Sequence, residues 1–414
     1  MSDLARARRC PLSADLSADT LDKLDTLKPA RARWSAARAD AASRTRAALH
    51  RALPALGLFA AARLAGMAFM ALWAWHIGRS PRALLAYSWD SRWYAHIAAH
   101  GYGRTLRFPG IVQSDLAFFP LYPGLIRAVT GVLPVTGGTA GLLLSWSAAG
   151  VAAWGIYLVG ERLHGRTTAT LLVLLWGLLP HSIVLSMAYT EPLLTAFAAF
   201  SLYAVLTRRW LWAGGLAVLA GLSRPSGIAV AAAVSVTAAY ELVRLRGRGP
   251  WRLWAGAAVA PLGWAGYVLW VGVRVGDPLG GYFAVQRGWS SRFDLGAGSL
   301  GVVQDLVTRR ADLGFPVALL VVAVAVVLFA LLTLAGPPLP VLVYSTVLLL
   351  ITVGGSGFFE SKPRFLLPAF PLLLPLAAAL RKARPRAAIV VITALAGLSF
   401  CYGTYLLTLA SMAL

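Results

Sequence analysis

Charged side chains are scarce in this sequence. Asp, Glu, Lys and Arg account for only 13% of the 414 residues, whereas ordinary soluble domains carry about a quarter. The hydrophobic residues, 58% of the total, form long uncharged blocks such as 317–334 and 387–414. One transmembrane helix needs about 20 predominantly apolar residues. This composition excludes a soluble globular domain and predicts an integral membrane protein that crosses the bilayer many times.

Cysteines and glycine-rich motifs are also lacking. Cys10 and Cys401 are the only cysteines, so the sequence provides neither a disulfide framework nor a cysteine metal site. It contains no phosphate-binding glycine loop of the P-loop or Rossmann type. A cytoplasm-facing enzyme that uses a nucleotide sugar is therefore not expected.

Acidic residues are few enough to leave a formal net charge of +22. In a soluble protein, that excess would suggest binding to nucleic acid. Here the Lys and Arg residues lie mostly in short clusters between apolar blocks, which is how membrane proteins set their orientation. The expected partners are therefore membrane lipids and not nucleic acid.

Two regions follow from this pattern. Residues 1–50 are polar and predict a partly disordered cytoplasmic tail with a helix over 36–50, whereas 51–414 predict one multi-span membrane domain. The predicted fold class is an all-α polytopic membrane protein with about 10–11 transmembrane or re-entrant helices. The expected segments are 52–76, 118–135 (broken by prolines, so re-entrant, superficial or a poor span), 138–160, 167–187, 192–206, two short helices in 211–243 that fold back at Arg224-Pro225, 253–273, 314–335, 339–353, 365–380 and 387–409.

The basic clusters predict the orientation. Placing the tail in the cytoplasm also places there the clusters at 162–166, 208–209, 244–252 and 381–386, as the positive-inside tendency requires. The long polar loops 77–117 and 274–312 then face outward, together with most acidic residues beyond the tail. Because acidic residues do not set orientation, their outward bias indicates an external polar site in the cell membrane.

The first outer loop contains the strongest candidate for chemistry. Asp90 lies in the run Trp89-Asp90-Ser91-Arg92-Trp93-Tyr94, at the boundary between an apolar helix region and water. Ionisable groups near membrane depth are costly and tend to be functional, and aromatic rings at that level suit stacking against sugar faces. An interfacial aromatic belt with a solvated aspartate explains the same residues equally well.

Three further charged residues belong to the expected outer side. Glu191 begins a helix, where an acid also gains from the helix macrodipole. Arg224 lies between apolar stretches and needs an anion, a carbonyl cluster or water. Arg364, in Lys362-Pro363-Arg364, is suited to binding a phosphate or to reaching the lipid headgroups.

Evidence for a metal is weaker. His96 and His100 have the spacing of a metal-binding helix face, but no third ligand is evident. No cofactor or metal site is predicted, although the sequence is compatible with a divalent metal. In the second outer loop, Trp289 belongs to a segment that either closes over a site or caps the bundle.

Several of these motifs together resemble bacterial members of the glycosylphosphatidylinositol mannosyltransferase II-like (PIG-V-like) family. The run 89–94, followed by Gly101-Tyr102, is similar to the signature loop of that family. Five later motifs follow in the family's order: Phe118–Pro123 (FFPLYP), Tyr189-Thr190-Glu191, Ser223–Gly227 (SRPSG), Gly288-Trp289 and Pro363–Pro368 (PRFLLP). The resemblance extends over about residues 50–385. Ser223 and Ser226 depart conservatively from the threonines that are commoner there.

This resemblance implies a C-type (GT-C) glycosyltransferase that uses a polyprenyl-phosphate sugar donor, usually mannose, on the outer face. It also implies a catalytic carboxylate in the first outer loop, which is Asp90 here. The resulting hypothesis is that Asp90 acts as general base on an acceptor hydroxyl, which attacks the anomeric carbon with inversion. Arg364 and Arg224 would hold the donor phosphate. The candidates for substrate binding are Trp89, Arg92, Trp93, Tyr94, Glu191 and Trp289.

The sequence leaves the acceptor open among a lipid, a glycan and a protein. The alternatives are a transporter or flippase of a lipid-linked sugar and a C-type transferase for another sugar. A transporter would need paired broken helices in its two halves, and the break at Arg224-Pro225 has no evident counterpart.

Overall fold

The computed structural model describes residues 18–109, 111–308 and 312–410. The chain divides into two compact units, Met1–Arg51 and Ala52–Leu414. The first described helix, α1, spans Ala18–His76, so the helix expected over 36–50 is part of a longer one. Residues 1–17 of the expected tail lie outside the described residues, and partial disorder of the tail stays a prediction.

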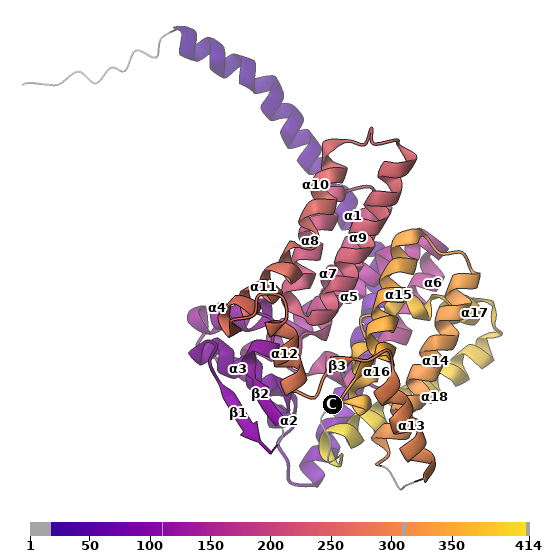
Figure 1. Ribbon diagram of the computed structural model, residues 1–414. Coiled ribbons are helices and arrows are strands. Elements are labelled where there is room, and N and C mark those ends of the chain that lie inside the picture. The colour runs from indigo at the N-terminus through magenta and orange to yellow at the C-terminus, as the bar shows by residue number, and fades with distance from the viewer. Residues whose placement is uncertain (1–17, 110, 309–311, 411–414) are drawn as a thin grey trace, which may run out of the picture. The chain divides into compact units, whose positions relative to one another are not determined.

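The second unit is built almost entirely of helices (Figure 1). They are α2 (Pro81–Tyr87), α3 (Asp90–His100), α4 (Leu121–Val132), α5 (Gly137–His164), α6 (Arg166–Gly177), α7 (Glu191–Leu206), α8 (Trp210–Ser223), α9 (Ile228–Arg244), α10 (Trp251–Val259), α11 (Leu262–Val275), α12 (Gly281–Gly288), α13 (Ala297–Thr308), α14 (Gly314–Leu334), α15 (Leu339–Gly354), α16 (Lys362–Phe365), α17 (Leu374–Lys382) and α18 (Pro385–Thr408).

Two short antiparallel strand pairs accompany the helices. Strands β1 (Thr105–Phe108) and β2 (Ile111–Ser114) form a hairpin in which Thr105 lies opposite Ser114. Strands β3 (Arg292–Phe293) and β4 (Gly355–Ser356) join the second long loop to the segment that leads into α16. Both predicted outer loops are therefore structured rather than plain connections.

Six helical segments of the described chain are long and apolar enough to cross a membrane. They are Thr45–His76, Gly137–His164, Pro225–Arg244, Trp251–Val275, Gly314–Leu334 and Pro385–Thr408. A pair bent by 79°, Phe359–Phe365 with Phe370–Lys382, adds a broken span or a re-entrant loop, and α7, α8 and α15 are shorter apolar helices. The predicted all-α polytopic membrane fold is confirmed.

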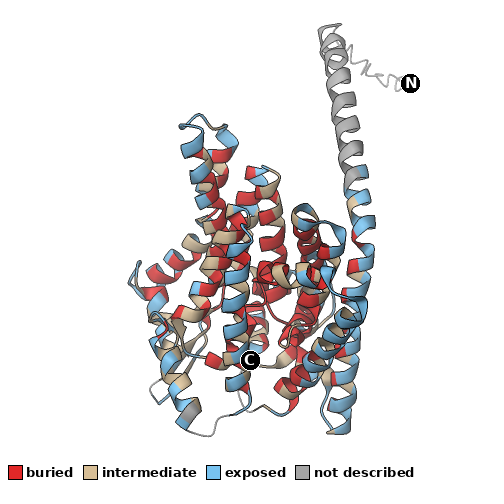
Figure 2. Ribbon diagram, turned by 90° about the vertical axis from the view of Figure 1, so that its right-hand side faces the viewer, coloured by how far each residue is buried: buried red, intermediate tan, exposed pale blue. Residues whose placement is uncertain are grey.

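The core lies around α5 and α7. Within its most apolar window, α5 is 61% buried, whereas α14 is only 17% buried, so α14 belongs to the periphery. Figure 2 shows the same distribution, with buried residues inside the bundle and exposed ones outside. Gly155 allows α5 and α7 to approach closely, because a Cβ there would lie 2.8 Å from Ala199. Small residues commonly allow such close helix contacts in membranes.

The structure corrects two predicted spans, and 365–380 is one of them, because the pair Phe359–Phe365 and Phe370–Lys382 is bent by 79°. Residues 167–187 do not form a single helix, because α6 ends at Gly177 and a 3₁₀ turn follows at Ser182–Ser186. Pro180 accounts for the break, since proline lacks an amide donor and restricts the residue before it. The expected break at Arg224-Pro225 is confirmed, because α8 ends at Ser223 and α9 begins at Ile228.

The segment expected over 118–135 contains only the 12-residue helix α4. This length is too short for a transmembrane helix and agrees with the superficial or re-entrant alternative.

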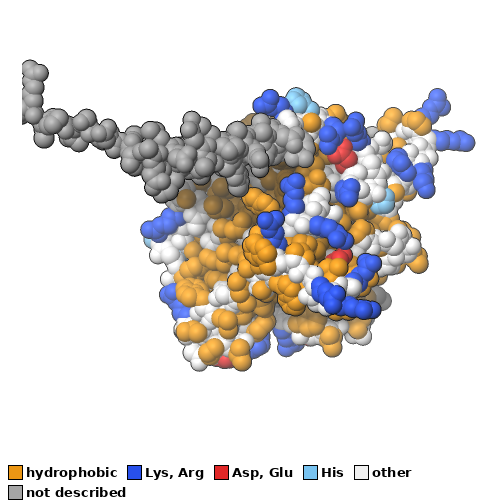
Figure 3. All heavy atoms as spheres, turned by 90° about the horizontal axis from the view of Figure 1, so that it is seen from above, with side chains coloured by type: hydrophobic (Ala, Val, Ile, Leu, Met, Phe, Trp, Pro, Cys, Tyr) orange, Lys and Arg blue, Asp and Glu red, His pale blue; other side chains and the backbone are white. Residues whose placement is uncertain are grey.

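On one face of the molecule, seen in Figure 3, Lys and Arg side chains lie among hydrophobic ones and acidic side chains are few. The cytoplasmic orientation of the basic clusters stays a prediction.

Candidate active site

Four charged side chains from four separate segments meet in the second unit. We call Asp90, Glu191, Arg224 and Arg364 the charged cluster. Arg364 pairs with Asp90 (Nη1 to Oδ2, 2.8 Å) and with Glu191 (Nε to Oε1, 3.3 Å). Arg224 pairs with the same Glu191 oxygen (Nη1 to Oε1, 2.5 Å). The order of contacts is Asp90, Arg364, Glu191 and Arg224, so carboxylates and guanidinium groups alternate and their formal charges balance.

Asp90 is the carboxylate of the cluster that water reaches more easily. Its side chain is 20% exposed, while that of Glu191 is fully buried. Asp90 is the first residue of α3, and the preceding Trp89 has a φ of 47°. A positive φ is strained for a bulky residue, and strain of this kind clusters at functional sites. The turn before α3 therefore fixes where this carboxylate points.

Glu191 is the first residue of α7, where the helix N-terminus favours an acid. In addition, its carboxylate is buried between the guanidinium groups of Arg224 and Arg364. A buried carboxylate is tolerated only when it is paired. Glu191 therefore links the break at Arg224 to the segment at Arg364.

Arg224 lies at the break between α8 and α9, in extended conformation with φ of −158°. Its Nη1 also donates to the hydroxyl of Thr190 at 3.0 Å, and its guanidinium lies 5.8 Å from the centre of the Phe365 ring. Within the described chain, Nε and Nη2 of Arg224 form no hydrogen bond. These donors are free to bind an anion.

Lys362 has a different role from Arg364, although the two are neighbours in one motif. Its ammonium group donates to the carbonyls of Thr352 and Gly355 and to the hydroxyl of Ser299, each at 2.7 Å. These bonds hold the β4 turn against α13 and leave Arg364 as the cation of this motif in the charged cluster.

The predicted aromatic candidates lie mainly in a packed group. Trp93 stacks on Phe118 (ring centres 5.6 Å apart) and meets Trp289 edge-on (5.2 Å). Tyr94 also packs edge-on against Phe118, and its hydroxyl lies 3.2 Å from that of Thr190. Of these rings, Tyr94 reaches the charged cluster, through Thr190 and Arg224, and Trp93 and Tyr94 are buried while Trp289 is partly buried.

The other two candidates of this loop lie elsewhere. Trp89 is partly buried against the main core. Arg92 is exposed and donates through Nε to the carbonyl of Tyr87 at 2.5 Å. The structure therefore does not join Arg92 to the charged cluster.

Two residues of the site were not singled out from the sequence, although both belong to the quoted Tyr189-Thr190-Glu191 motif. Thr190 connects Tyr94 to Arg224 through its hydroxyl. The Tyr189 ring centre lies 5.2 Å from the Arg364 guanidinium carbon, a cation–π distance. Their position beside Glu191 in the sequence was the available signal.

No group of three or more potential metal ligands occurs among the described residues. His96 and His100 lie close, with ring centres 4.6 Å apart. Burial, followed by the positive charge of Arg104, lowers the pKa of His96. This pair lies in the first long loop and does not contact the charged cluster.

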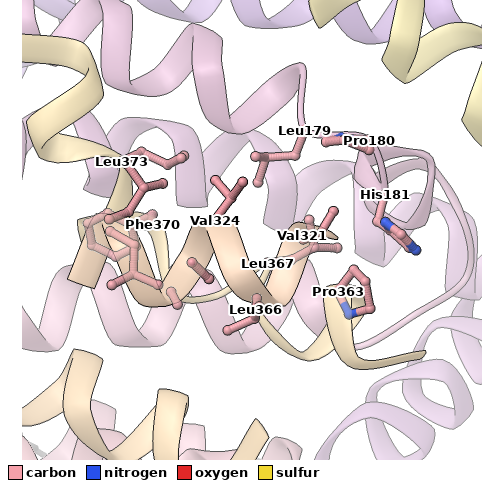
Figure 4. A pocket seen from close by; sticks show the side chains of 14 residues that line it. Leu179, Pro180, His181, Val321, Val324, Pro363, Leu366, Leu367, Phe370 and Leu373 are labelled. Atoms are coloured by element: carbon pink, nitrogen blue, oxygen red, sulfur yellow. The ribbon is translucent and has the colours of Figure 1, made fainter. Parts of the chain in front are cut away.

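An apolar pocket lies between α14, the turn after α6 and the bent segment that begins with α16 (Figure 4). Pro363, the residue before Arg364, lines it together with residues of α14. Leu179, Pro180 and His181, from the turn after α6, also line it, and Figure 4 shows His181 and Pro363 toward the same end of the pocket, away from Phe370 and Leu373.

No protein-family model matches the sequence, and no curated protein matches it. Among solved structures, the chain is similar to the apo form of an oligosaccharyltransferase from Archaeoglobus fulgidus (TM-score 0.42, 14% identity, 83% of this chain and 55% of that chain). It is also similar to oligosaccharyltransferase AglB from Archaeoglobus fulgidus in complex with an inhibitory peptide and a dolichol-phosphate (TM-score 0.44, 14% identity, 85% of this chain and 55% of that chain). The match thus spans about half the length of these proteins.

Proposed function

We propose that this chain is a membrane glycosyltransferase of the C-type superfamily that transfers mannose from a polyprenyl-phosphate donor to an acceptor on the outer face. The observation that carries the proposal is the charged cluster, in which a partly exposed carboxylate, Asp90, pairs directly with Arg364, and Glu191 joins Arg364 to the second cation, Arg224. A lipid-phosphate sugar needs these two kinds of group, a base for the acceptor and cations for the phosphate.

Asp90 is the general base of this mechanism. It removes the proton from the acceptor hydroxyl, whose oxygen forms a bond to the anomeric carbon as the bond from that carbon to the phosphate oxygen breaks. The configuration at the anomeric carbon is inverted, and the lipid phosphate leaves with the electron pair of the broken bond. Because this leaving group is a stabilised anion, it requires little acid assistance.

The arginines hold the phosphate in place. Arg364 is shared between Asp90 and Glu191, and a donor phosphate competes for the same guanidinium through charge-assisted hydrogen bonds. When the phosphate takes over Arg364, the Asp90 carboxylate is released to accept a proton. Glu191 remains paired with Arg224 and holds the second cation at the site.

The finer features of the proposal come from the resemblance to the mannosyltransferase II-like family and from the distribution of basic residues. They are the choice of mannose, the PIG-V-like assignment, the cytoplasmic N-terminus and the outward-facing site. The acceptor is left open.

Transfer of radiolabelled mannose from polyprenyl-phosphate-mannose, by membranes that contain the full chain, tests the proposal. We expect Asp90→Asn to reduce transfer about 10²–10⁴-fold at matched protein levels, the usual contribution of a general base. Asp277→Asn, the same change in the second long loop, serves as the control and should leave transfer unchanged. Undiminished transfer by Asp90→Asn removes Asp90 as the base. Absence of transfer by the wild type contradicts the proposed donor and favours the transporter alternative.

A further inference from the structure

His181 is a buried imidazole that the mechanism above does not use. It lies in the turn between α6 and the 3₁₀ segment Ser182–Ser186, and only 1% of it is exposed. Its ring packs edge-on against Tyr402. Neither ring nitrogen forms a hydrogen bond within the part of the chain that the structure describes. A buried polar side chain without a partner is costly and requires an explanation.

The apolar pocket supplies a context for this side chain. Val321 and Val324 of α14 line it from one direction, and Leu366 and Phe370 of the bent segment line it from another (Figure 4). Of the described residues that line the pocket, His181 alone has a polar side chain. Because α14 is the least buried of the six candidate spans, the pocket lies beside a helix with much of its surface available to lipid.

The pocket also adjoins the charged cluster. Pro363 lines the pocket, and the next residue, Arg364, pairs with Asp90 and Glu191. His181 and Pro363 lie at the same end of the pocket (Figure 4), so the apolar lining, the imidazole and Arg364 follow one another. A polyprenyl phosphate has a matching sequence of groups, an isoprenoid chain joined to an anionic phosphate.

We propose that His181 is a donor-binding residue, which hydrogen-bonds the lipid phosphate where the apolar pocket meets Arg364. The inference rests on the proposed function and names a further residue of the same site. A neutral imidazole has one N–H donor and a protonated one has two, so either form can donate to a phosphate oxygen. The pocket holds the first isoprene units, Arg364 supplies the charge, and His181 gains the partner that the protein does not provide.

Binding of polyprenyl monophosphate to the purified full chain tests this role without any sugar transfer. The matched polyprenol, which lacks the phosphate, is the reference ligand. We expect His181→Leu to weaken binding of the monophosphate about 10- to 100-fold, the usual loss for a hydrogen bond to a charged group, and to leave polyprenol binding unchanged. His181→Gln keeps an N–H donor and should recover part of the affinity.

Two further variants separate binding from folding. Thr168, near the opposite end of α6, has a buried hydroxyl that, like the His181 ring, forms no hydrogen bond among the described residues. Thr168→Val removes this hydroxyl and should leave the binding of both lipids unchanged. Val324→Trp fills the pocket and should weaken the binding of both. In the absence of lipid, His181→Leu should unfold at the same temperature as the wild type or higher, because it removes an unpartnered polar group.

Equal affinity of wild type and His181→Leu for the monophosphate would overturn the inference, as would an equal loss for both lipids. If the wild type binds the monophosphate through His181 and yet transfers no mannose, the proposed function fails and this inference stands. If transfer occurs with the same donor KM in wild type and His181→Leu, the function stands and this inference fails.

Discussion

Two equally buried arginines of this molecule have opposite kinds of partner. Arg63 and Arg364 are each 6% exposed. Arg63, in α1, donates to the hydroxyls of Ser182 (2.6 Å) and Ser186 (2.8 Å) and to the carbonyl of Gly177 (3.2 Å). Arg364 instead pairs with two carboxylates.

The two sets of partners separate an arginine with structural contacts, Arg63, from one that the proposed mechanism uses, Arg364. The partners of Arg63 are neutral groups at the end of α6 and in the turn that follows, where the C-terminal carbonyls of a helix favour a cation. Ser182 continues this contact to Ser399 of α18 (2.9 Å). Arg63 therefore fastens three segments together, whereas the buried ion pairs of Arg364 offer charges that a substrate anion can exchange. Buried ion pairs rarely add stability over apolar packing, which agrees with the role in phosphate binding proposed for Arg364.

The largest effect on stability is expected from breaking the charged cluster at its centre. Glu191→Gln removes the carboxylate that Arg224 and Arg364 share and leaves Arg224 buried without a counter-ion. We expect the free energy of unfolding to fall by about 3–5 kcal/mol, measured by denaturation in detergent micelles. The control is Glu241→Gln, which breaks the surface pair with Arg208 and should cost less than about 1 kcal/mol.

The double variant Glu191→Gln/Arg224→Gln sharpens this prediction. Removing both charges leaves no unpaired ion between these two residues, so the double variant should be more stable than the sum of the two single changes predicts. Strict additivity in the denaturation experiment would mean that the two side chains do not interact.

A smaller loss is expected at the structural arginine. Arg63→Gln takes donors away from Ser182, Ser186 and the carbonyl of Gly177, and the free energy of unfolding should fall by about 1–3 kcal/mol. At a temperature where the variant stays folded, donor KM should be that of the wild type. A variant of wild-type stability that has lost transfer would contradict the division between the two arginines and place Arg63 in substrate binding.

A still smaller effect is expected at the far end of the same contact. Ser399→Ala removes hydrogen bonds to Ser182 and to the carbonyl of Leu179, each worth about 0.5–1.5 kcal/mol net. Thermal unfolding should shift in the same direction as for Arg63→Gln but less. An unchanged unfolding temperature would show that the hydrogen bonds of Ser399 add nothing to the contact that Arg63 makes with Ser182.

The smallest effect is expected at Asp294, in the second long loop. This residue belongs neither to a buried ion pair nor to the candidate active site. Burial raises the pKa of Asp294, but hydrogen bonds from the amides of Gly298 and Gly296 outweigh it and lower this pKa below its ordinary value of 3.8. The folded pKa is therefore the lower one, so the stabilisation is complete above the unfolded value and is lost as the pH falls through the folded pKa.

Limited proteolysis of the full chain at acid pH, with an acid-active protease, measures this loss. Cleavage in the loop 289–300 should rise as the pH falls below the ordinary aspartate range. Asp294→Asn should make cleavage less dependent on pH, because the side chain no longer titrates. A wild-type loop with the same susceptibility across that range would contradict the capping role of Asp294.

The sequence predicted the membrane class and named every member of the charged cluster. It could not give their pairing, because the contacts join residues 90, 191, 224 and 364 across most of the second unit. The helix break at Arg224-Pro225 was predictable because proline and a charge interrupt the same apolar run.

Two misses have identifiable causes. Arg63 lies inside an expected span, and a charge at that depth was itself a signal of a buried partner. His181 was hidden within the expected span 167–187, although Pro180 argued against a continuous helix there. In both cases the average hydropathy of a segment concealed single residues that depart from it.

One short segment serves three places at once, since Lys362 binds the β4 turn, Pro363 lines the apolar pocket and Arg364 joins the charged cluster. Consecutive residues of a helix point in directions about 100° apart, so their order assigns each side chain to its place. Inserting or deleting a single residue between β4 and α16 would rotate all three assignments together. Related chains that share the site should therefore keep the spacing from β4 to Arg364 unchanged.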